Sequence, residues 1–287
     1  MPSGRSSVDA ASARRRAIAA LAGAGIPFPA READLLLASA TGQPSAFLLA
    51  HPEFSLDEAM RSTLVGMVSR RSSREPLQYI LGEWAFYGHP LAMSDKILVP
   101  RPETELLVER ALEWLPDDGT FLDWGTGSGC IAIALLIERP SCSCIAVDAS
   151  PSALDVAWRN MRRHDVLHRA LLWHSRTPRD IPLRGERLAL IVSNPPYIPT
   201  ALLPTLMEEV RREPMVALDG GVDGLKWYRA LLEWAPGALR PGGRILVEVG
   251  DGQQAVALSS LPLSGLRHER TVHDLAGVPR MVQWIRV

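Results

Sequence analysis

The chain has 287 residues, of which 47% are hydrophobic and 22% charged, with a formal net charge of −1 and a pI near 6.7. This length allows two domains or one large α/β domain, and the composition supports a core without metals or disulfides. A protein built mainly to grip nucleic acid would carry a clear basic excess. Since no apolar run approaches membrane-spanning length either, we expect neither stable nucleic-acid binding nor membrane insertion.

The first 75 residues show helical patterns. Residues 8–23 and 29–40 have helical spacing, and the second stretch begins with Pro29 and ends before Gly42. Ser55 and Glu58 fit a capping box that opens a helix through residue 70. Three arginines at positions 14–16 could imitate an organellar transit peptide, but the helical pattern continues without a cleavage boundary. We therefore predict a helical domain over residues 1–75.

The next stretch differs in composition. Prolines and glycines interrupt short apolar runs over residues 76–102, which predicts a connecting β-hairpin. Residues 103–115 return to helical spacing and open a third region, residues 103–287. From residue 120 strands and helices alternate, which predicts a parallel sheet with crossover helices. We expect strands at 121–123, 145–148, 188–193 and 244–249, helices at 130–138 and up to about 163, and a terminal strand pair at 268–272 and 281–287.

The three cysteines, Cys130, Cys142 and Cys144, cannot all pair with one another. Two of them form a Cys-x-Cys, but no histidine cluster accompanies it, so free thiols in a reducing cytoplasm are the better interpretation. We expect no metal site and a cytoplasmic protein.

A glycine-rich turn, Asp-Trp-Gly-Thr-Gly-Ser-Gly at 123–129, lies between a predicted strand and a predicted helix. Such a turn lets a ligand approach the backbone closely, but nicotinamide and flavin sites use similar turns. Cys130 stands where the dinucleotide pattern has its last glycine. Asp148, at the tip of the next strand, can accept both ribose hydroxyls of an adenosine. The alternative is a tight turn beside a helix-capping Asp148.

Asn194, Pro195, Pro196 and Tyr197 follow an apolar strand. Two adjacent prolines exclude a helix, so the chain leaves the strand in a fixed extended shape. The turn presents two acceptors, the Asn194 side-chain oxygen and the Pro195 carbonyl, with Tyr197 as a flat wall. An amide or exocyclic amino group has two hydrogens to donate, so two fixed acceptors can orient its nitrogen toward a methyl donor. Taken alone, this turn leaves glutamine and adenine equally open, and a merely proline-rich strand exit is the alternative.

Over nearly its whole length the chain resembles the HemK/PrmC family of protein-(glutamine-N5) methyltransferases. The likeness rests on segments at 75–82 (EPLQYILG), 99–105 (VPRPETE), 125–129, 147–148, 193–198, 213–225, 248–253 and 274–280. The Asn-Pro-Pro-Tyr motif is shared with adenine-N6 methyltransferases, whereas the first two segments are more specific and favour glutamine. The resemblance implies a Rossmann-like α/β methyltransferase sheet, mostly parallel with an antiparallel C-terminal strand, joined by the hairpin to the helical N-terminal domain.

The resemblance also implies the reaction and its residues. S-adenosylmethionine is the expected cofactor, and the expected partner is a peptide chain release factor, methylated on the glutamine of its Gly-Gly-Gln tripeptide. The cofactor-binding residues implied are Gly125, Thr126, Gly127, Ser128, Gly129, Asp148 and Asn194. The substrate pocket is formed by Asn194, Pro195, Pro196 and Tyr197, of which Asn194, Pro195 and Tyr197 are catalytic. Arg101 and Glu103 shape the lip of this pocket, or form a solvated ion pair at the start of a helix.

The chain departs from the family pattern in two places. Trp124 replaces a small aliphatic residue, and residues 175–177 (Ser-Arg-Thr) stand where the family carries an acidic residue beside the adenine. The adenine contact is therefore unassigned, with Asp180 as a conceivable substitute. The alternative functions are glutamine methylation of a ribosomal protein, adenine-N6 methylation of nucleic acid, and an inactive cofactor-binding module. Adenine-N6 methylation would need a basic groove or a base-reading domain. We expect a monomer.

Overall fold

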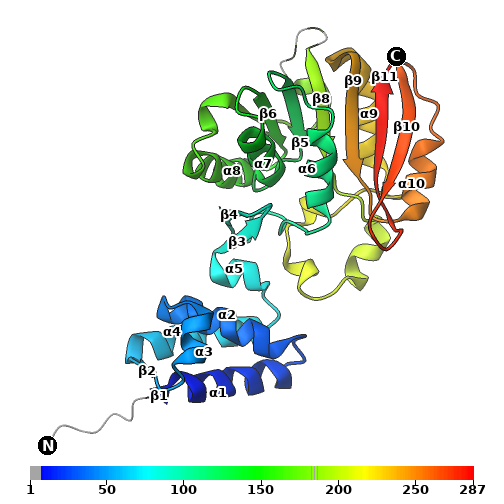
Figure 1. The fold of residues 1–287 in the computed structure, drawn as a ribbon. Coiled ribbons are helices and arrows are strands. Elements are labelled where there is room, and N and C mark those ends of the chain that lie inside the picture. The colour runs from blue at the N-terminus through cyan, green and yellow to red at the C-terminus, as the bar shows by residue number, and fades with distance from the viewer. Residues whose placement is uncertain (1–7, 182, 184, 186) are drawn as a thin grey trace, which may run out of the picture. The chain divides into compact units, whose positions relative to one another are not determined.

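A computed structural model describes residues 8–181, 183, 185 and 187–287. The chain divides into two compact units. The first contains the residues up to Gly82 and a later segment, Glu208–Arg212, which we call the return segment. The second contains Glu83–Met207 and Glu213–Val287. Figure 1 shows the elements of both units in the colours of the chain order.

The first unit is helical, as the sequence predicts. Its elements are β1 (Val8–Asp9), α1 (Ala10–Gly23), α2 (Pro29–Thr41), α3 (Ser45–Ala50), β2 (Ser55–Leu56), α4 (Glu58–Ser72) and α5 (Leu77–Leu81). The predicted capping box at Ser55 is wrong, because Ser55 pairs with Asp9 between the two short strands. Asp57 caps α4 instead, and its side chain accepts a hydrogen bond from the Met60 amide at 2.8 Å.

A buried arginine organises the charges of this unit. The Arg71 side chain is only 5% exposed, and its Nε donates to Glu32 Oε2 at 2.6 Å. Its Nη1 donates to Glu209 Oε1 at 3.2 Å, and Arg74 Nη1 reaches the same oxygen at 3.1 Å. Because Glu209 lies in the return segment, these ion pairs hold that segment within the helical unit.

The second unit opens with a short hairpin. Strands β3 (Glu83–Phe86) and β4 (His89–Ala92) pair antiparallel through a two-residue turn, with φ of 50° at Tyr87 and 75° at Gly88. Positive φ at both turn residues matches the right-handed twist of the strands. Within the predicted hairpin region, strands are thus confined to residues 83–92, and residues 77–81 are helical.

Seven strands form the main sheet, in the order β10-β11-β9-β8-β5-β6-β7. Their bounds are β5 (Thr120–Trp124), β6 (Ser143–Asp148), β7 (Ala170–His174), β8 (Leu188–Ser193), β9 (Leu239–Glu248), β10 (Leu266–His273) and β11 (Pro279–Arg286). The strands from β9 to β7 run parallel, and β11 runs antiparallel to both β9 and β10. The predicted fold class is confirmed, although β7 was not predicted: it lies at the sheet edge and has no fully buried residue.

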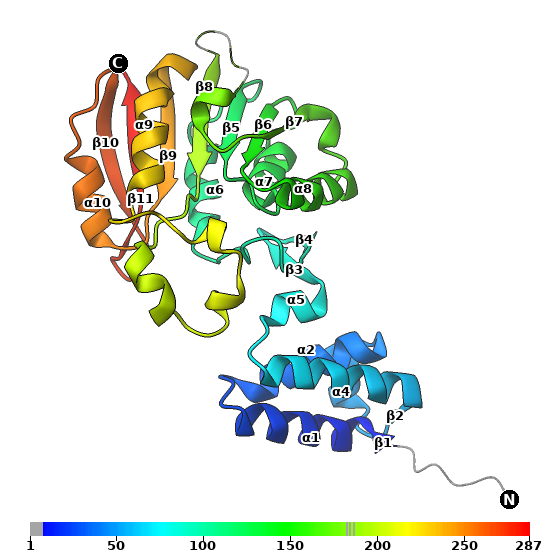
Figure 2. The ribbon, with the colours of Figure 1, turned by 180° about the vertical axis from the view of Figure 1, so that it is seen from behind.

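Helices cover both faces of this sheet. They are α6 (Thr104–Leu112), α7 (Cys130–Glu138), α8 (Pro151–Arg163), α9 (Lys226–Ala238) and α10 (Gly252–Ser259). Short 3-10 helices lie at Leu167–Arg169, Pro178–Asp180, Thr200–Thr205, Val210–Arg212 and Met215–Ala217. Figure 1 shows α6 in front of the sheet, whereas the opposite view in Figure 2 shows α9 in front of it.

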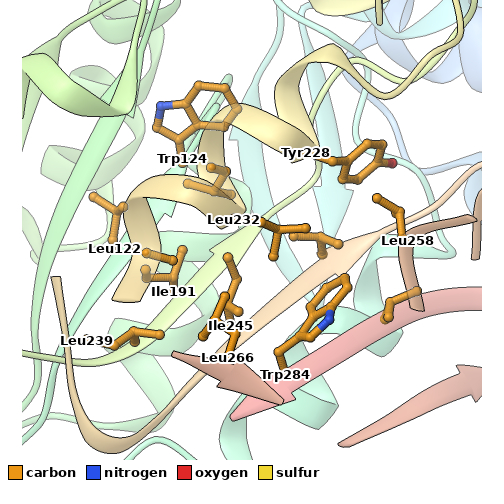
Figure 3. Close-up of a cluster of buried hydrophobic side chains, with 14 of the residues drawn as sticks. Leu122, Trp124, Ile191, Tyr228, Leu232, Leu239, Ile245, Leu258, Leu266 and Trp284 are labelled. Carbon is orange, nitrogen blue, oxygen red and sulfur yellow. The ribbon is translucent and has the colours of Figure 1, made fainter. Parts of the chain in front are cut away.

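The core of the second unit fixes the strand ends that carry the candidate site. All six residues of β8 are buried, which is typical of a central parallel strand. Between α9 and the sheet, side chains of the helix such as Tyr228 and Leu232 pack with Leu122, Ile191 and Ile245 of the strands (Figure 3). The carboxyl ends of β5, β8 and β9 are therefore held by close packing on the adjoining sheet face.

All three cysteines are buried and unpaired. Burial raises the pKa of the Cys130 thiol to about 12. Within the described part of the chain, no group of His, Cys, Asp and Glu side chains is arranged to hold a metal ion. No helix in that part is both long and apolar enough to cross a bilayer.

Candidate active site

The glycine turn closes the carboxyl end of β5 with three residues in the left-handed region. The φ angles of Gly125, Gly127 and Gly129 are 80°, 55° and 81°. The Gly125 and Thr126 amides donate to the Val147 carbonyl at 2.8 and 2.9 Å. A Cβ at Gly127 would meet nothing within 4 Å, so the turn needs glycine there for conformation and leaves an open space above the backbone.

Asp148 ties this turn to the next strand. Its Oδ2 accepts from the Gly127 amide at 2.9 Å, and its Oδ1 accepts from the Ser150 amide at 2.8 Å. Burial raises the pKa of this carboxyl, which the backbone hydrogen bonds partly oppose. The alternative of a helix-capping Asp148 is wrong, because Ser150 caps α8 through a hydrogen bond from the Ala153 amide. Each carboxylate oxygen keeps a lone pair for a ligand hydroxyl.

The Asn-Pro-Pro-Tyr turn leaves β8 beside the glycine turn. Ser193 Oγ donates to the Trp124 carbonyl at 2.6 Å and so joins the ends of β8 and β5. Asn194 Nδ2 donates to Thr104 Oγ1 at 3.1 Å, and Thr104 Oγ1 donates to Glu248 Oε2 at 2.7 Å. Asn194 is thus held by its amide nitrogen, which leaves its oxygen available as an acceptor.

Tyr197 is clamped by three glycines, Gly220, Gly224 and Gly250, which the sequence indicates only through the family resemblance. A Cβ at Gly220 or Gly250 would lie 2.8 Å from atoms of Tyr197, and one at Gly224 would also collide with it. Gln254 Nε2 donates to the Tyr197 carbonyl at 2.7 Å. The turn is therefore fixed on both sides, and burial raises the pKa of Tyr197 to about 12, so its hydroxyl stays neutral.

One pocket joins the two motifs. Its lining includes five predicted residues, namely Gly125, Gly127, Asp148, Asn194 and Pro196. Other residues lining it are Lys96, Ile97, Leu98, Trp124, Ala149, Ser150, Ala153, Ser175, Arg176, Pro214, Val216, Ala217 and Trp227. The predicted residues outside this lining are Thr126, Ser128, Gly129, Pro195 and Tyr197. The side chains of Thr126 and Ser128 are buried under the loop, where Thr126 donates to Asp123 at 2.7 Å.

The two places where the sequence departs from the family pattern both lie at this pocket. Trp124 lines it, and the Trp124 ring packs at a tilt against that of Trp227, with 5.9 Å between ring centroids. Ser175 and Arg176 also line it, whereas Asp180 does not. The Ser175 hydroxyl donates to the Thr177 carbonyl at 2.7 Å. The segment at 175–177 therefore contributes Ser175 and Arg176 to the pocket lining, but no carboxylate.

Arg101 pairs with a residue more than a hundred positions away. Its Nη2 donates to Glu213 Oε1 at 2.6 Å, and the Val99 amide donates to Glu213 Oε2 at 3.2 Å. Glu213 is buried, which raises its pKa. Glu103 lies exposed at the start of α6. This pair links the segment before α6 to Pro214, which lines the pocket.

The acceptor, the open turn and the aromatic walls of this pocket suit an adenosine bearing a methionine chain. The open glycine turn can admit a chain close to the backbone, the Asp148 carboxylate can accept ribose hydroxyls, and the aromatic walls can pack on a base. The methyltransferase from Pyrococcus furiosus matches 76% of this chain and 98% of its own, with a TM-score of 0.54 at 20% identity, which shows the fold. The family model "Methyltransferase small domain" matches residues 101–208. Fold and site define an S-adenosylmethionine-dependent methyltransferase.

The particular family follows from the rest of the chain. The model "PrmC N-terminal domain" matches residues 12–82. The release factor glutamine methyltransferase of Geobacter sulfurreducens is 41% identical over 91% of this chain and 91% of its own. That of Cereibacter sphaeroides is 41% identical over 95% of this chain and 97% of its own. The chain belongs to the family of release factor glutamine methyltransferases.

Proposed function

We propose that this chain transfers the methyl group of S-adenosylmethionine to the side-chain amide nitrogen of the glutamine in the Gly-Gly-Gln motif of peptide chain release factors. The observation that carries the proposal is Asn194, which lines the pocket and is held by Nδ2, so that its oxygen is left to accept. A glutamine amide has the matching donors. The near-full-length identity to relatives of that name supports the choice of substrate.

The residues act by holding groups in place. When bound, S-adenosylmethionine would supply an electrophilic methyl group on a sulfonium and leave as the neutral thioether, while the methylated nitrogen gives up one proton to solvent. Asp148 would accept the ribose hydroxyls, and the turn at Gly125 and Gly127 would hold the methionine chain. The Asn194 oxygen and the Pro195 carbonyl accept the two hydrogens of the substrate amide, which turns its nitrogen toward the methyl group. Tyr197, clamped by its glycines, completes the wall of the glutamine site.

The helical region supports a second part of this proposal. We infer that residues 1–75 dock the substrate protein, that residues 76–102 form a linker, and that residues 103–287 form the catalytic domain. A macromolecular substrate needs more contact area than one pocket supplies. The match of residues 12–82 to the PrmC N-terminal domain supports a role tied to this family. The enzyme acts as a cytoplasmic monomer and forms no stable complex with nucleic acid.

A methyl-transfer assay tests the substrate. Purified protein should transfer a labelled methyl group to a bacterial release factor, and changing the tripeptide glutamine of that factor to alanine should abolish the label. Asn194→Ala should lower turnover by about 10²- to 10³-fold, because one oriented polar contact to the reacting group is lost. Cofactor binding should be weakened but measurable.

Other acceptors are outcomes of the same assay. Label on nucleic acid would indicate an adenine substrate, and label on a ribosomal protein with none on the release factor would indicate a different glutamine. Label that survives the glutamine change, or full turnover by Asn194→Ala, would contradict the proposal.

A further inference from the structure

Three side chains from three elements form a hydrogen-bonded row behind the pocket. Asn194 follows β8, Thr104 is the first residue of α6, and Glu248 is the last residue of β9. The distances are 3.1 Å from Asn194 Nδ2 to Thr104 Oγ1 and 2.7 Å from Thr104 Oγ1 to Glu248 Oε2. Thr104 is 2% exposed and Glu248 is 4% exposed. Solvent therefore cannot readily take over either hydrogen bond.

The row has a direction set by its single hydroxyl hydrogen. An ionised Glu248 can only accept, so the Thr104 hydroxyl must donate to it. The Thr104 oxygen can then only accept, and the amide NH2 of Asn194 is the group that can donate to it. With a protonated Glu248, the Thr104 hydroxyl is free to donate to the Asn194 oxygen, and the Asn194 amide can rotate so that its oxygen and NH2 group exchange places.

We propose that Thr104 and Glu248 are positioning residues for methyl transfer, which hold the Asn194 amide with its oxygen toward the substrate nitrogen. This inference rests on the proposed function and deepens it. If the Asn194 amide were rotated in this way, its N–H groups would face the N–H groups of the substrate glutamine. Two donors facing each other lose the hydrogen bond and leave polar groups unpaired, so the row determines whether the site can bind an amide productively.

The charged and titratable groups around Glu248 influence its pKa, and so the pH above which the row is oriented. Arg101, Glu103 and Arg280 act on Glu248, and Glu248 acts in turn on Tyr197, Tyr228 and Cys130. The Tyr228 hydroxyl donates to the main-chain oxygen of Glu248 at 2.7 Å. Burial raises the pKa of Glu248 to about 7, and Glu103 adds to this, whereas Thr104 and the two arginines oppose it. The carboxylate is therefore lost as pH falls through about 7. Activity should fall in the same direction.

The composition of the chain offers a direct test. It has only two asparagines, Asn160 and Asn194. Protein labelled with ¹⁵N on asparagine side chains should thus give two NH2 signals, and Asn194→Ala assigns them. Asn160 is a built-in control, because its amide is fully buried and bonded to main-chain groups at 2.7 to 3.2 Å.

In the substrate-free enzyme, the Asn194 signal should shift between about pH 5.5 and 8.5, a range that spans the titration of a carboxyl with a raised pKa. The Asn160 signal should stay in place. Glu248→Gln should remove the shift, and so should Thr104→Val, which breaks the row while keeping the carboxyl. An Asn194 shift that persists in Thr104→Val would show a through-space effect and overturn the inference.

Kinetics test the consequence for transfer. Thr104→Val should lower kcat by about 10- to 100-fold with little change in the cofactor KM, because a small misplacement of a group that orients the substrate can cost about 100-fold in rate. Thr104→Ser, which restores the hydroxyl, should return kcat to within about 3-fold of the original. Thr120→Val is the matched control, because Thr120 also forms a side-chain hydrogen bond, to Ser143 at 2.9 Å, but at the other end of β5.

The acid limb of kcat should disappear in Glu248→Gln. This comparison is needed because burial also raises the pKa of Asp123 to about 7, and Asp123 would still titrate in that variant. If the wild type methylates the release factor, two results would overturn the positioning role and leave the proposed function standing. One is an acid limb that is unchanged in Glu248→Gln, and the other is full turnover by Thr104→Val. If the wild type does not methylate the release factor, the proposed function fails, whereas the NMR arm still decides whether the row orients Asn194.

Discussion

Asp148 uses one carboxylate to hold the glycine turn and to face the pocket. The Gly127 and Ser150 amides both point at it, so its orientation is set before any ligand arrives. A carboxylate can accept from these two amides and from two further hydroxyls. An asparagine in its place has only one accepting atom, and its NH2 would face one of the amide donors.

Asp148→Asn should therefore weaken cofactor binding by about 10- to 100-fold, because hydrogen bonds to a charged group contribute about 1.5–3 kcal/mol, while the release factor KM changes little. Trp124 and Trp227 line the pocket, so tryptophan emission can report the dissociation constant. Asp155→Asn, an exposed change on α8, is the control. Equal affinities for the two variants would contradict a ribose-binding Asp148.

The junction between β9 and α10 helps to fix the position of the Tyr197 ring. Gly250 stands at this junction, and a Cβ there would lie 2.8 Å from the Tyr197 ring and 3.1 Å from Gln254 Oε1. Gly252, two residues on, has room: its nearest neighbour would be Pro279 Cγ at 3.5 Å. Neither glycine has a positive φ, so alanine tests crowding alone.

Gly250→Ala should displace Tyr197 and lower the free energy of unfolding by about 1–3 kcal/mol, the usual cost of overpacking. Turnover should fall with it, while Gly252→Ala should leave both near the original values. Thermal unfolding and the methyl-transfer assay measure the two effects. A Gly250→Ala variant as stable and active as Gly252→Ala would show that the clamp yields.

Local signals account for most of the elements that the sequence predicts. Alternating strand and helix patterns give the sheet, and the glycine and Asn-Pro-Pro-Tyr turns lie at its strand ends, as expected for open α/β sheets. Strand β7 (ALLWH) escaped prediction because a short apolar run without period-2 alternation does not distinguish a strand from a helix. The partners of Asn194 and Arg101 could not be predicted, because they lie 90 and 112 residues away in the chain.

The whole chain is not two consecutive blocks. The return segment lies between β8 and α9 in the sequence, yet it belongs to the helical unit, where Glu209 pairs with Arg71 and Arg74. Arg71 is the more deeply buried of the two arginines and also pairs with Glu32. Removing one member of a buried ion-pair group leaves the other charges without compensation.

Arg71→Leu should lower the stability of the helical unit by about 3–5 kcal/mol, because Glu32 loses its buried partner and Glu209 keeps only Arg74. Arg70→Leu is the neighbouring control, since Arg70 pairs with Glu75 at the surface, and such pairs contribute about 0–1 kcal/mol. Denaturant unfolding, with hydrogen exchange at the return segment, distinguishes the two variants. Similar protection of that segment in both would show that Arg71 does not hold it.

The return segment also affects how a fragment of the protein that contains the helical unit can be produced. A fragment ending at residue 82, where the N-terminal family match ends, would keep Arg71 and Arg74 but lose Glu209. It would carry two arginines without one of their carboxylate partners, one of them in its interior. An excised piece would call for an acidic peptide in place of the missing segment, because a neutral residue at position 71 would leave Glu32 without its partner. Residues up to 82 therefore lack part of the helical unit, and a fragment that folds independently has to be engineered.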